Sequence, residues 1–188
     1  MICPPKLVPG DTIALVSPAK AIESSHIEFA KDYLEKQGFH VLVGAHSANE
    51  YRYFSGTDME RAEDLQWAID HPDVKAIICL RGGSGAARLL PLLDYALIKA
   101  KPKILLGYSD ITALHSAIQA KTGLVTFHGP NGAGSWNHFN AEQFRQLFFQ
   151  RQAMHYQNIT TDEDELVPRQ NRIITITPGK VQGELIGG

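Results

Sequence analysis

Val74-Lys-Ala-Ile-Ile-Cys-Leu80, followed at once by Arg81-Gly-Gly-Ser-Gly85, is the stretch of sequence that decides the fold. All of the first seven residues except Lys75 are apolar, and such a run is typical of a strand buried on both faces of a parallel sheet. The glycines that follow indicate a tight turn. We therefore predict a buried strand over residues 74–80 with a glycine-rich loop at its carboxyl end.

The same pattern recurs along the chain. Short apolar runs predict strands at residues 12–16, 40–43, 103–106 and 124–127, and amphipathic spacing predicts helices at residues 24–38, 58–69, 86–93, 111–120 and 141–149. Strands that alternate with helices indicate a mainly parallel sheet covered on both faces and joined by right-handed crossovers. The predicted fold class is α/β, with a doubly wound sheet.

The predicted helix at residues 58–69 carries four charged side chains away from its apolar face. They are Glu60, Arg61, Glu63 and Asp64. Charges on an amphipathic helix usually form a solvated face. We therefore expect these four side chains to lie in solvent and to take no part in catalysis.

The composition changes after about Ala153. Residues 160–165 are acidic and residues 173–177 alternate like a strand with two different faces. We expect residues 1–153 to form an N-terminal α/β domain. Residues 154–188 are expected to be a connector and the beginning of a truncated second domain.

The overall composition excludes several classes of function. Of the 188 residues, 44% are hydrophobic and 20% are charged, and the net charge is −2, as in ordinary globular proteins. Lys and Arg are scattered among acids, so no nucleic-acid partner is expected. The chain has neither a membrane span nor a secretory signal, which predicts a cytoplasmic protein with no membrane partner. Cys3 and Cys79 fit no Cys/His metal pattern, so no metal is expected.

Three polar or glycine-rich loops follow predicted strands. They are residues 81–85, residues 107–110 (Gly-Tyr-Ser-Asp) and residues 128–130 (His-Gly-Pro). In open parallel sheets, ligands bind beyond the carboxyl ends of the strands. We therefore expect these loops to share one rim and to form one site.

Ser109 is the strongest candidate for chemistry in that site. A serine in a strand-to-helix turn, two residues after Gly107, resembles a nucleophile elbow, although Ile111 stands where the second glycine of such a motif would be. The helix that begins near Asp110 would point backbone N–H groups at the attacked carbonyl and so stabilise an oxyanion. The alternative is that Ser109 or Asp110 only caps this helix.

The other loop residues leave more than one interpretation open. Residues 81–85 would cradle a phosphate, supply a second oxyanion donor, or serve only as a tight turn. They match neither a dinucleotide fingerprint nor a phosphate-loop lysine motif, and we expect no cofactor. His128 stands where a catalytic base would act, although a lone histidine at a strand end is more often a scaffold residue. His115 is expected to be structural.

Five segments in order resemble the successive motifs of the LD-carboxypeptidases, which are serine peptidases of the murein-recycling type. They are residues 5–19, residues 55–65, residues 81–85, residues 107–112 and residues 128–130. The similarity extends to Gly183-Glu-Leu-Ile-Gly-Gly188, which resembles the start of the family's C-terminal domain. The resemblance implies a flavodoxin-like N-terminal domain that carries the nucleophile, at the position of Ser109.

The resemblance also implies roles for other loop residues. The backbone N–H groups of Asp110 and Gly83 would form the oxyanion hole. Arg81, Gly82, Ser84 and His128 are expected to contact the substrate, and the family commonly has Tyr where Ser84 stands. The family's glutamate and histidine have no matching positions up to residue 188, so we expect the 188-residue chain alone to be inactive.

Substrates of the family are murein tetrapeptides, which are cut between an L-centre of a diamino acid and the terminal D-alanine. Relatives that resemble microcin-immunity peptidases act on peptidyl-nucleotide analogues instead. A flavodoxin-like module that binds a small ligand without chemistry is the alternative from another class. A homodimer is an open expectation, because an absent second domain would leave apolar surface exposed.

Overall fold

The computed structural model describes residues 1–134, 136–151 and 176–183. The chain divides into two compact units, Met1–Ser135 and Trp136–Ile186, and each is described here by itself. The acidic stretch at residues 160–165 and most of the expected second domain lie outside the described residues. Residues 176–183 are exposed and contain no strand. The expected boundary near residue 153 therefore stays a prediction.

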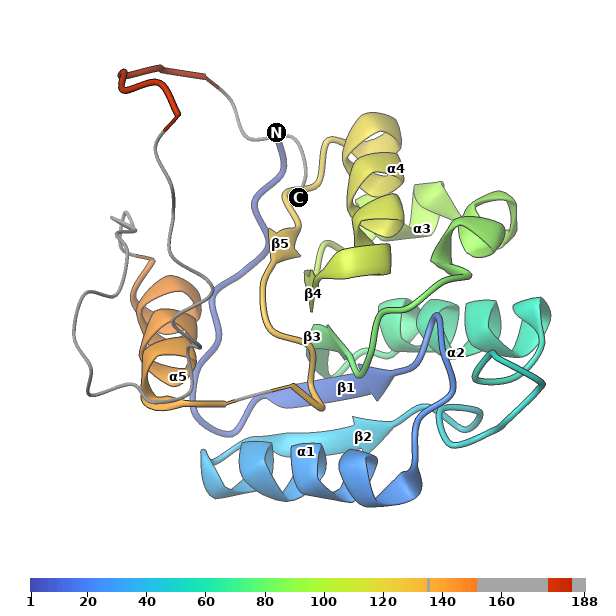
Figure 1. Cartoon of the computed structure of the whole chain (residues 1–188). Helices are drawn as coiled ribbons and strands as arrows, with labels where there is room; N and C mark the ends of the chain where they lie inside the picture. Colours follow the sequence, from blue (N-terminus) through green and yellow to red (C-terminus); the bar gives the residue numbers. More distant parts are fainter. Residues whose placement is uncertain (135, 152–175, 184–188) are drawn as a thin grey trace. The chain divides into compact units, whose positions relative to one another are not determined.

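A five-stranded parallel sheet forms the centre of the first unit (Figure 1). Its strands are β1 (Thr12–Val16), β2 (His40–Val43), β3 (Val74–Cys79), β4 (Ile104–Gly107) and β5 (Phe127–His128). The strand order is β2-β1-β3-β4-β5, and all neighbours are parallel. This is the order of flavodoxin-like sheets, in which ligands bind near the point where the order reverses, here between β1 and β3. The predicted α/β class is confirmed.

Helical segments follow the first four strands. They are α1 (Ser24–Lys36), α2 (Asp58–Asp70), the 3-10 segment η1 (Ala86–Leu92), α3 (Tyr95–Ala100), the 3-10 turn η2 (Ser109–Ile111) and α4 (Thr112–Thr122). The helix predicted at residues 86–93 is a 3-10 segment with Pro91 inside it, because proline lacks the N–H that an α-helix would use. Helix α3 was not predicted.

One side of the sheet packs against α2, η1, α3 and α4. A single buried cluster joins Ala14 and Val16 of β1 to Leu65 of α2 and to Leu114 of α4. The buried residues of α1 are not part of this cluster, and Figure 1 shows α1 beside β2, away from α3 and α4. Alternate strand residues such as Ile13 are equally buried, so the central strands β1, β3 and β4 are covered on both faces.

The last strand is shorter and later than predicted. The apolar run at residues 124–127 predicted a strand, but β5 consists of Phe127 and His128. Leu124 instead forms a bridge with Ile2 near the N-terminus. The shift matters for the site, because it pairs His128 with Gly107 at the carboxyl end of β4.

The second unit has one described helical element. Helix α5 (His138–Arg145) continues into the π-helical turn η3 (Gln146–Gln150), which overlaps the helix predicted at residues 141–149. The ring of Phe144 lies 5.4 Å from that of Trp136 and 4.8 Å from that of Phe148, centroid to centroid. These edge-to-face contacts are packing contacts.

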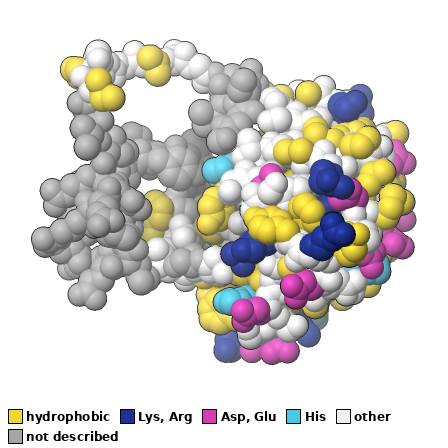
Figure 2. Space-filling model, turned by 45° about the vertical axis from the view of Figure 1, so that its right-hand side comes forward, with side chains coloured by type: hydrophobic (Ala, Val, Ile, Leu, Met, Phe, Trp, Pro, Cys, Tyr) yellow, Lys and Arg dark blue, Asp and Glu magenta, His cyan; other side chains and the backbone are white. Residues whose placement is uncertain are grey.

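The surface shows no gathering of one kind of charge on the face drawn in Figure 2, where Lys and Arg side chains lie among acidic and apolar ones. Within the described ranges, no helix is long and apolar enough to cross a bilayer. The same residues contain no cluster of three or more His, Cys, Asp or Glu side chains that could hold a metal ion.

The solvated face predicted for α2 is wrong for two of the four charged residues assigned to it, Arg61 and Asp64. Arg61 is 1% exposed and Asp64 is 4% exposed. The carboxylate of Asp64 accepts hydrogen bonds from the N–H of His46 at 3.0 Å and from the Ser47 hydroxyl at 3.1 Å, and so fixes the turn after β2. Burial raises the pKa of Asp64. The backbone partners of Arg61 lie in the loops after β1 and β3, at the carboxyl edge of the sheet.

Candidate active site

The predicted loops meet at the carboxyl edge of the sheet, together with a fourth loop after β1. The N–H of Lys20 donates to the carbonyl of Gly82 at 3.3 Å, and the N–H of Gly129 donates to the carbonyl of Gly107 at 3.2 Å. Because β1, β3, β4 and β5 are neighbours in the sheet, their carboxyl ends must lie side by side. The same reasoning applied to β1 would have predicted the contribution of residues 17–20.

Ser109 is exposed and its backbone is left-handed, with φ of +64°. It follows Tyr108, whose backbone is extended, and it begins the turn η2 directly after β4. A left-handed conformation costs a residue with a Cβ about 1–2 kcal/mol. Strain of this kind concentrates at functional sites, where the surrounding structure imposes it. The hydroxyl-bearing residue is thus held in a sharp turn at the edge of the sheet.

Neither Ser109 nor Asp110 caps the helix that they begin. No side chain caps η2 or α4. The Asp110 carboxylate instead accepts a hydrogen bond at 2.8 Å from the N–H of Ala86, which begins η1. The helix-cap alternative is therefore wrong, and Asp110 ties the serine turn to the glycine-rich loop.

Gly107 explains how Ile111 replaces the second glycine of an elbow motif. A Cβ placed on Gly107 would lie 3.0 Å from Cys79 Cβ and from both γ-carbons of Ile111. The Ile111 side chain is fully buried. A glycine at position 107 leaves the space that the isoleucine fills, so the turn keeps its sharp shape with one glycine.

Gly82 lies directly against the serine turn. A Cβ at this position would lie 3.1 Å from Ser109 Cβ, 3.1 Å from the carbonyl oxygen of Tyr108 and 3.4 Å from the backbone nitrogen of Asp110. Any larger residue would push the loop and the turn apart. The close approach of two backbones is the physical reason for glycine here.

The rest of the glycine-rich loop faces residues that the sequence did not point to. Gly83 has φ of +120°, and a Cβ on it would lie 2.7 Å from Lys20 Cβ and 2.9 Å from the Tyr53 hydroxyl. The Lys20 ammonium lies 5.3 Å from the centre of the Tyr53 ring. Arg81 and Ser84 are exposed. The loop therefore presents a cationic and aromatic surface beside Ser109.

Two histidines lie close to the serine turn. His128 is exposed, and its ring centre lies 6.2 Å from that of Tyr108 and 6.2 Å from that of His115. His115 is buried, and its Nε2–H donates to the carbonyl of Gly107 at 2.9 Å. Burial lowers the pKa of His115, and the nearby His128 adds to this. The structure thus supports the expected structural role of His115.

Asn131 is another residue that sequence reasoning missed. It is buried, and its side-chain oxygen accepts a hydrogen bond at 3.1 Å from the N–H of Tyr108. Asn131 therefore fixes the residue immediately before Ser109. No local pattern predicted this contact, because its partner is 23 residues away in the sequence.

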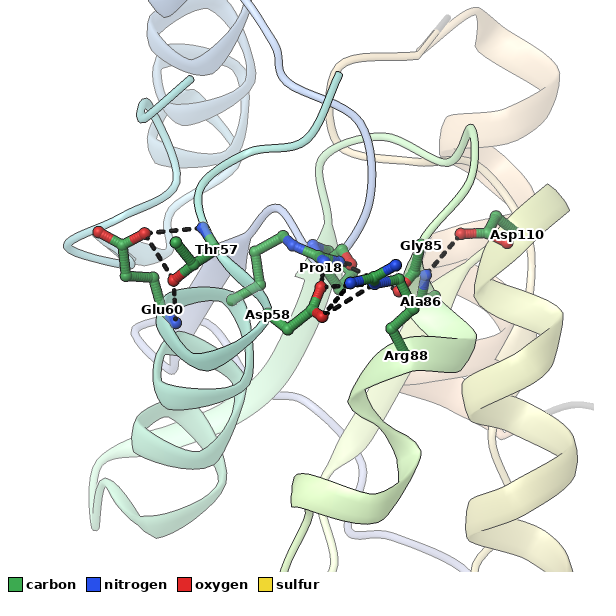
Figure 3. Close-up of polar contacts among 9 residues, drawn as sticks. Pro18, Thr57, Asp58, Glu60, Gly85, Ala86, Arg88 and Asp110 are labelled. Carbon is green, nitrogen blue, oxygen red and sulfur yellow. Dashed lines mark hydrogen bonds and ion pairs between the residues drawn. The ribbon is translucent and has the colours of Figure 1, made fainter. Parts of the chain in front are cut away.

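Arg61 reaches the rim from α2. One of its terminal nitrogens donates to the carbonyl of Pro18 at 2.6 Å and to the carbonyl of Gly85 at 3.1 Å (Figure 3). Its other terminal nitrogen pairs with Asp58, which Arg88 also binds through two nitrogens. Burial lowers the pKa of Arg61, but a guanidinium stays protonated in proteins. A buried charge therefore joins the loops after β1 and β3.

Comparisons with known proteins agree on one family. A family model described as "LD-carboxypeptidase N-terminal domain" matches residues 13–129. The chain is 37% identical over 190 residues to the "Probable murein peptide carboxypeptidase" of Bacillus subtilis, covering 98% of this chain and 56% of that protein. It is 43% identical over 123 residues to the "Murein tetrapeptide carboxypeptidase" of Pseudomonas aeruginosa, covering 65% and 40%.

A third relative has a name that describes a different function, immunity to a microcin. The "Microcin C7 self-immunity protein MccF" of Escherichia coli is 33% identical over 205 residues, covering 97% of this chain and 60% of that protein. A solved structure of MccF in complex with aspartyl sulfamoyl adenosine superposes with a TM-score of 0.79 at 31% identity, covering 96% and 57%. The chain thus spans at most 60% of the length of these three curated relatives.

Proposed function

The chain belongs to the LD-carboxypeptidase family, and from this we propose that its full-length gene product is a serine-type carboxypeptidase of murein tetrapeptides. The scissile bond joins an L-centre of a diamino acid to the terminal D-alanine. The names of the Bacillus subtilis and Pseudomonas aeruginosa relatives support this substrate class. We place the protein in the cytoplasm, where peptides of recycled murein would meet it.

The observation that carries the proposal is the exposed, left-handed Ser109 at the end of β4. Its Oγ attacks the carbonyl carbon of the diamino acid, and the C–N bond to D-alanine breaks as the amine takes a proton. Water then hydrolyses the resulting ester and frees Ser109. The N–H groups of Asp110 and Gly83 are the proposed donors to the oxyanion.

The loop residues around Ser109 are the proposed substrate contacts. Arg81, exposed on the loop after β3, is suited to a carboxylate of the peptide. Gly82 and Ser84 belong to the same loop. His128 lies at the end of β5, paired with Gly107 at the start of the serine turn. Lys20 and Tyr53 extend this surface.

A serine hydroxyl needs a base, and the family resemblance puts the base histidine and its orienting glutamate beyond the positions matched here. We therefore propose that residues 1–188 alone are inactive, since losing the base of such a unit costs on the order of 10⁶ in turnover. Release of D-alanine from a murein tetrapeptide by the isolated 188-residue chain at an ordinary enzymatic rate would overturn this statement.

Labelling with a fluorophosphonate tests the role of Ser109. The full-length gene product should be labelled, and Ser109→Ala should abolish labelling and D-alanine release while the protein stays folded. Equal labelling of the Ser109→Ala variant would exclude Ser109 as the nucleophile. Absence of labelling together with retained peptide affinity would favour a flavodoxin-like binding module without chemistry.

The likeness to MccF favours a second candidate substrate class, the peptidyl-nucleotide analogues. It covers 96% of this chain in a structure that holds aspartyl sulfamoyl adenosine. Comparing kcat/KM for a murein tetrapeptide and for aspartyl sulfamoyl adenosine decides between the two. A higher value for the nucleotide analogue would replace the murein assignment, with Ser109 in the same role.

A homodimer is a further expectation, which sedimentation of the full-length protein tests.

A further inference from the structure

We propose that Arg61 is a positioning residue for the reaction: it sets the place of the glycine-rich loop, residues 81–85, relative to Ser109. This inference rests on the proposed function, because the loop carries the proposed oxyanion donor. Arg61 is buried, and the hydrogen bonds of its terminal nitrogens go to Pro18, Gly85 and Asp58. Its effect is transmitted through the backbone that it holds.

The two carbonyls that Arg61 binds belong to the two loops at the point where the strand order reverses. Pro18 follows β1 and Gly85 ends the loop after β3, and they lie 43 and 24 residues from Arg61 in the sequence. A single nitrogen donates to both. Any displacement of one loop away from the other would break one of these hydrogen bonds.

The surroundings of Arg61 require a guanidinium rather than any cation. Its Cζ atom lies over the Phe54 ring, 4.9 Å from the ring centre, and the same ring would lie 2.8 Å from a Cβ on Gly85. Its second terminal nitrogen pairs with Asp58. A lysine has one compact ammonium and no planar face, so it cannot make these contacts together.

A short path leads from Arg61 to the serine turn. Arg61 binds the Gly85 carbonyl, and the next residue, Ala86, donates its N–H to the Asp110 carboxylate at 2.8 Å. Asp110 directly follows Ser109 and supplies the other proposed oxyanion donor. Figure 3 shows Pro18, Gly85, Ala86 and Asp110 along this path. Arg61 therefore binds the carbonyl of Gly85 at the end of the loop, and Asp110 binds the N–H of the adjacent residue, Ala86.

Lys103 offers a matched control. It is also a buried cation that donates to two backbone carbonyls, those of Ala68 and His71. It lies immediately before β4, at the edge of the sheet opposite the site. Substituting either cation removes a buried charge and two hydrogen bonds to backbone carbonyls, and Arg61 loses a third bond to Asp58. Of the two cations, Arg61 binds the glycine-rich loop.

The first test measures fluorophosphonate labelling of the full-length gene product, with the maximal rate and the half-saturating concentration determined separately. Arg61→Met and Arg61→Lys should each lower the maximal rate about 100-fold, with half-saturation changed less than about threefold. Lys103→Met should keep the wild-type maximal rate even if it lowers the Tm. A wild-type rate in Arg61→Lys, or an equal loss in Lys103→Met, would overturn the proposal.

The second test measures backbone amide hydrogen exchange and needs no catalysis. Arg61→Met should speed exchange at residues 81–86 at least about tenfold while leaving residues 104–107 unchanged, and Lys103→Met should not affect residues 81–86. Unchanged exchange at residues 81–86 in Arg61→Met would overturn the proposal. If even the wild-type protein resists labelling, the proposed peptidase function fails, and exchange alone decides whether Arg61 holds the loop.

Discussion

The carboxylate of Asp110 accepts a hydrogen bond from the backbone N–H of Ala86 at 2.8 Å. This contact joins the residue after Ser109 to the first residue of η1, and so links the turn after β4 to the loop after β3. A side chain that would ordinarily cap its own helix instead ties the serine turn to the end of the glycine-rich loop.

Replacement of Asp110 tests this link. Asp110→Ala leaves the Ala86 N–H without its acceptor, which should cost about 1–3 kcal/mol in the free energy of unfolding and slow fluorophosphonate labelling about 10-fold or more. Asp110→Asn keeps a side-chain oxygen and should stay close to wild type in both. Urea unfolding and labelling rates check this. Equal effects of the two substitutions would mean that charge matters and the hydrogen bond does not.

The backbone of Ser109 predicts that the proposed nucleophile lowers stability. Because φ is +64°, Ser109→Gly should raise the free energy of unfolding by about 1 kcal/mol through relief of the left-handed strain. Ser109→Ala keeps the Cβ and should bring no such gain, although both variants lose labelling. Urea unfolding of the two variants side by side makes the comparison. A lower free energy of unfolding in Ser109→Gly than in the wild type would contradict backbone strain at Ser109.

A methyl group on Gly82 would lie 3.1 Å from Ser109 Cβ, so the serine turn would have to shift by a few tenths of an ångström to admit it. Gly82→Ala should lower the free energy of unfolding by about 1–3 kcal/mol through overpacking, and should slow labelling because the loop moves away from Ser109. Gly179 is an exposed glycine with nothing near its Cβ position, so Gly179→Ala is the control and should change neither. Normal labelling by Gly82→Ala would show that the loop and the turn need not touch.

Buried His115 predicts a loss of stability in acid. Its pKa is lowered in the fold from the ordinary 6.5, so the unfolded chain binds a proton more readily than the folded chain. The free energy of unfolding should therefore lose nothing to His115 above about pH 6.5, and it should fall as the pH drops below that value. His115→Gln removes the titrating ring and should flatten this part of the profile. Urea unfolding between pH 5 and pH 8 measures both, and an identical slope in the variant would exclude His115 as the cause.

Several features of the fold were predictable because they follow from local chemistry. The runs that form β1, β2, β3 and β4 were placed to within one residue at each end. The buried strands β1, β3 and β4 are mainly apolar, as strands covered on both faces must be. The short helix α3 was missed, although Asp94 before it is a readable cap whose carboxylate accepts from the N–H of Leu97. Leu124 was misassigned because apolarity alone does not identify the pairing partner.

The sequence by itself determined the parallel α/β fold, the family and the gathering of the glycine-rich loops with Ser109 at one edge, because apolar runs and turn glycines act on their own neighbours. Only the tertiary structure decided that Arg61 and Asp64 are buried and that Asp110 binds Ala86. Burying a charged side chain is costly unless hydrogen-bonding or charged partners surround it. Here these partners come from chain segments 17 to 43 residues away, which no local pattern in the sequence reveals.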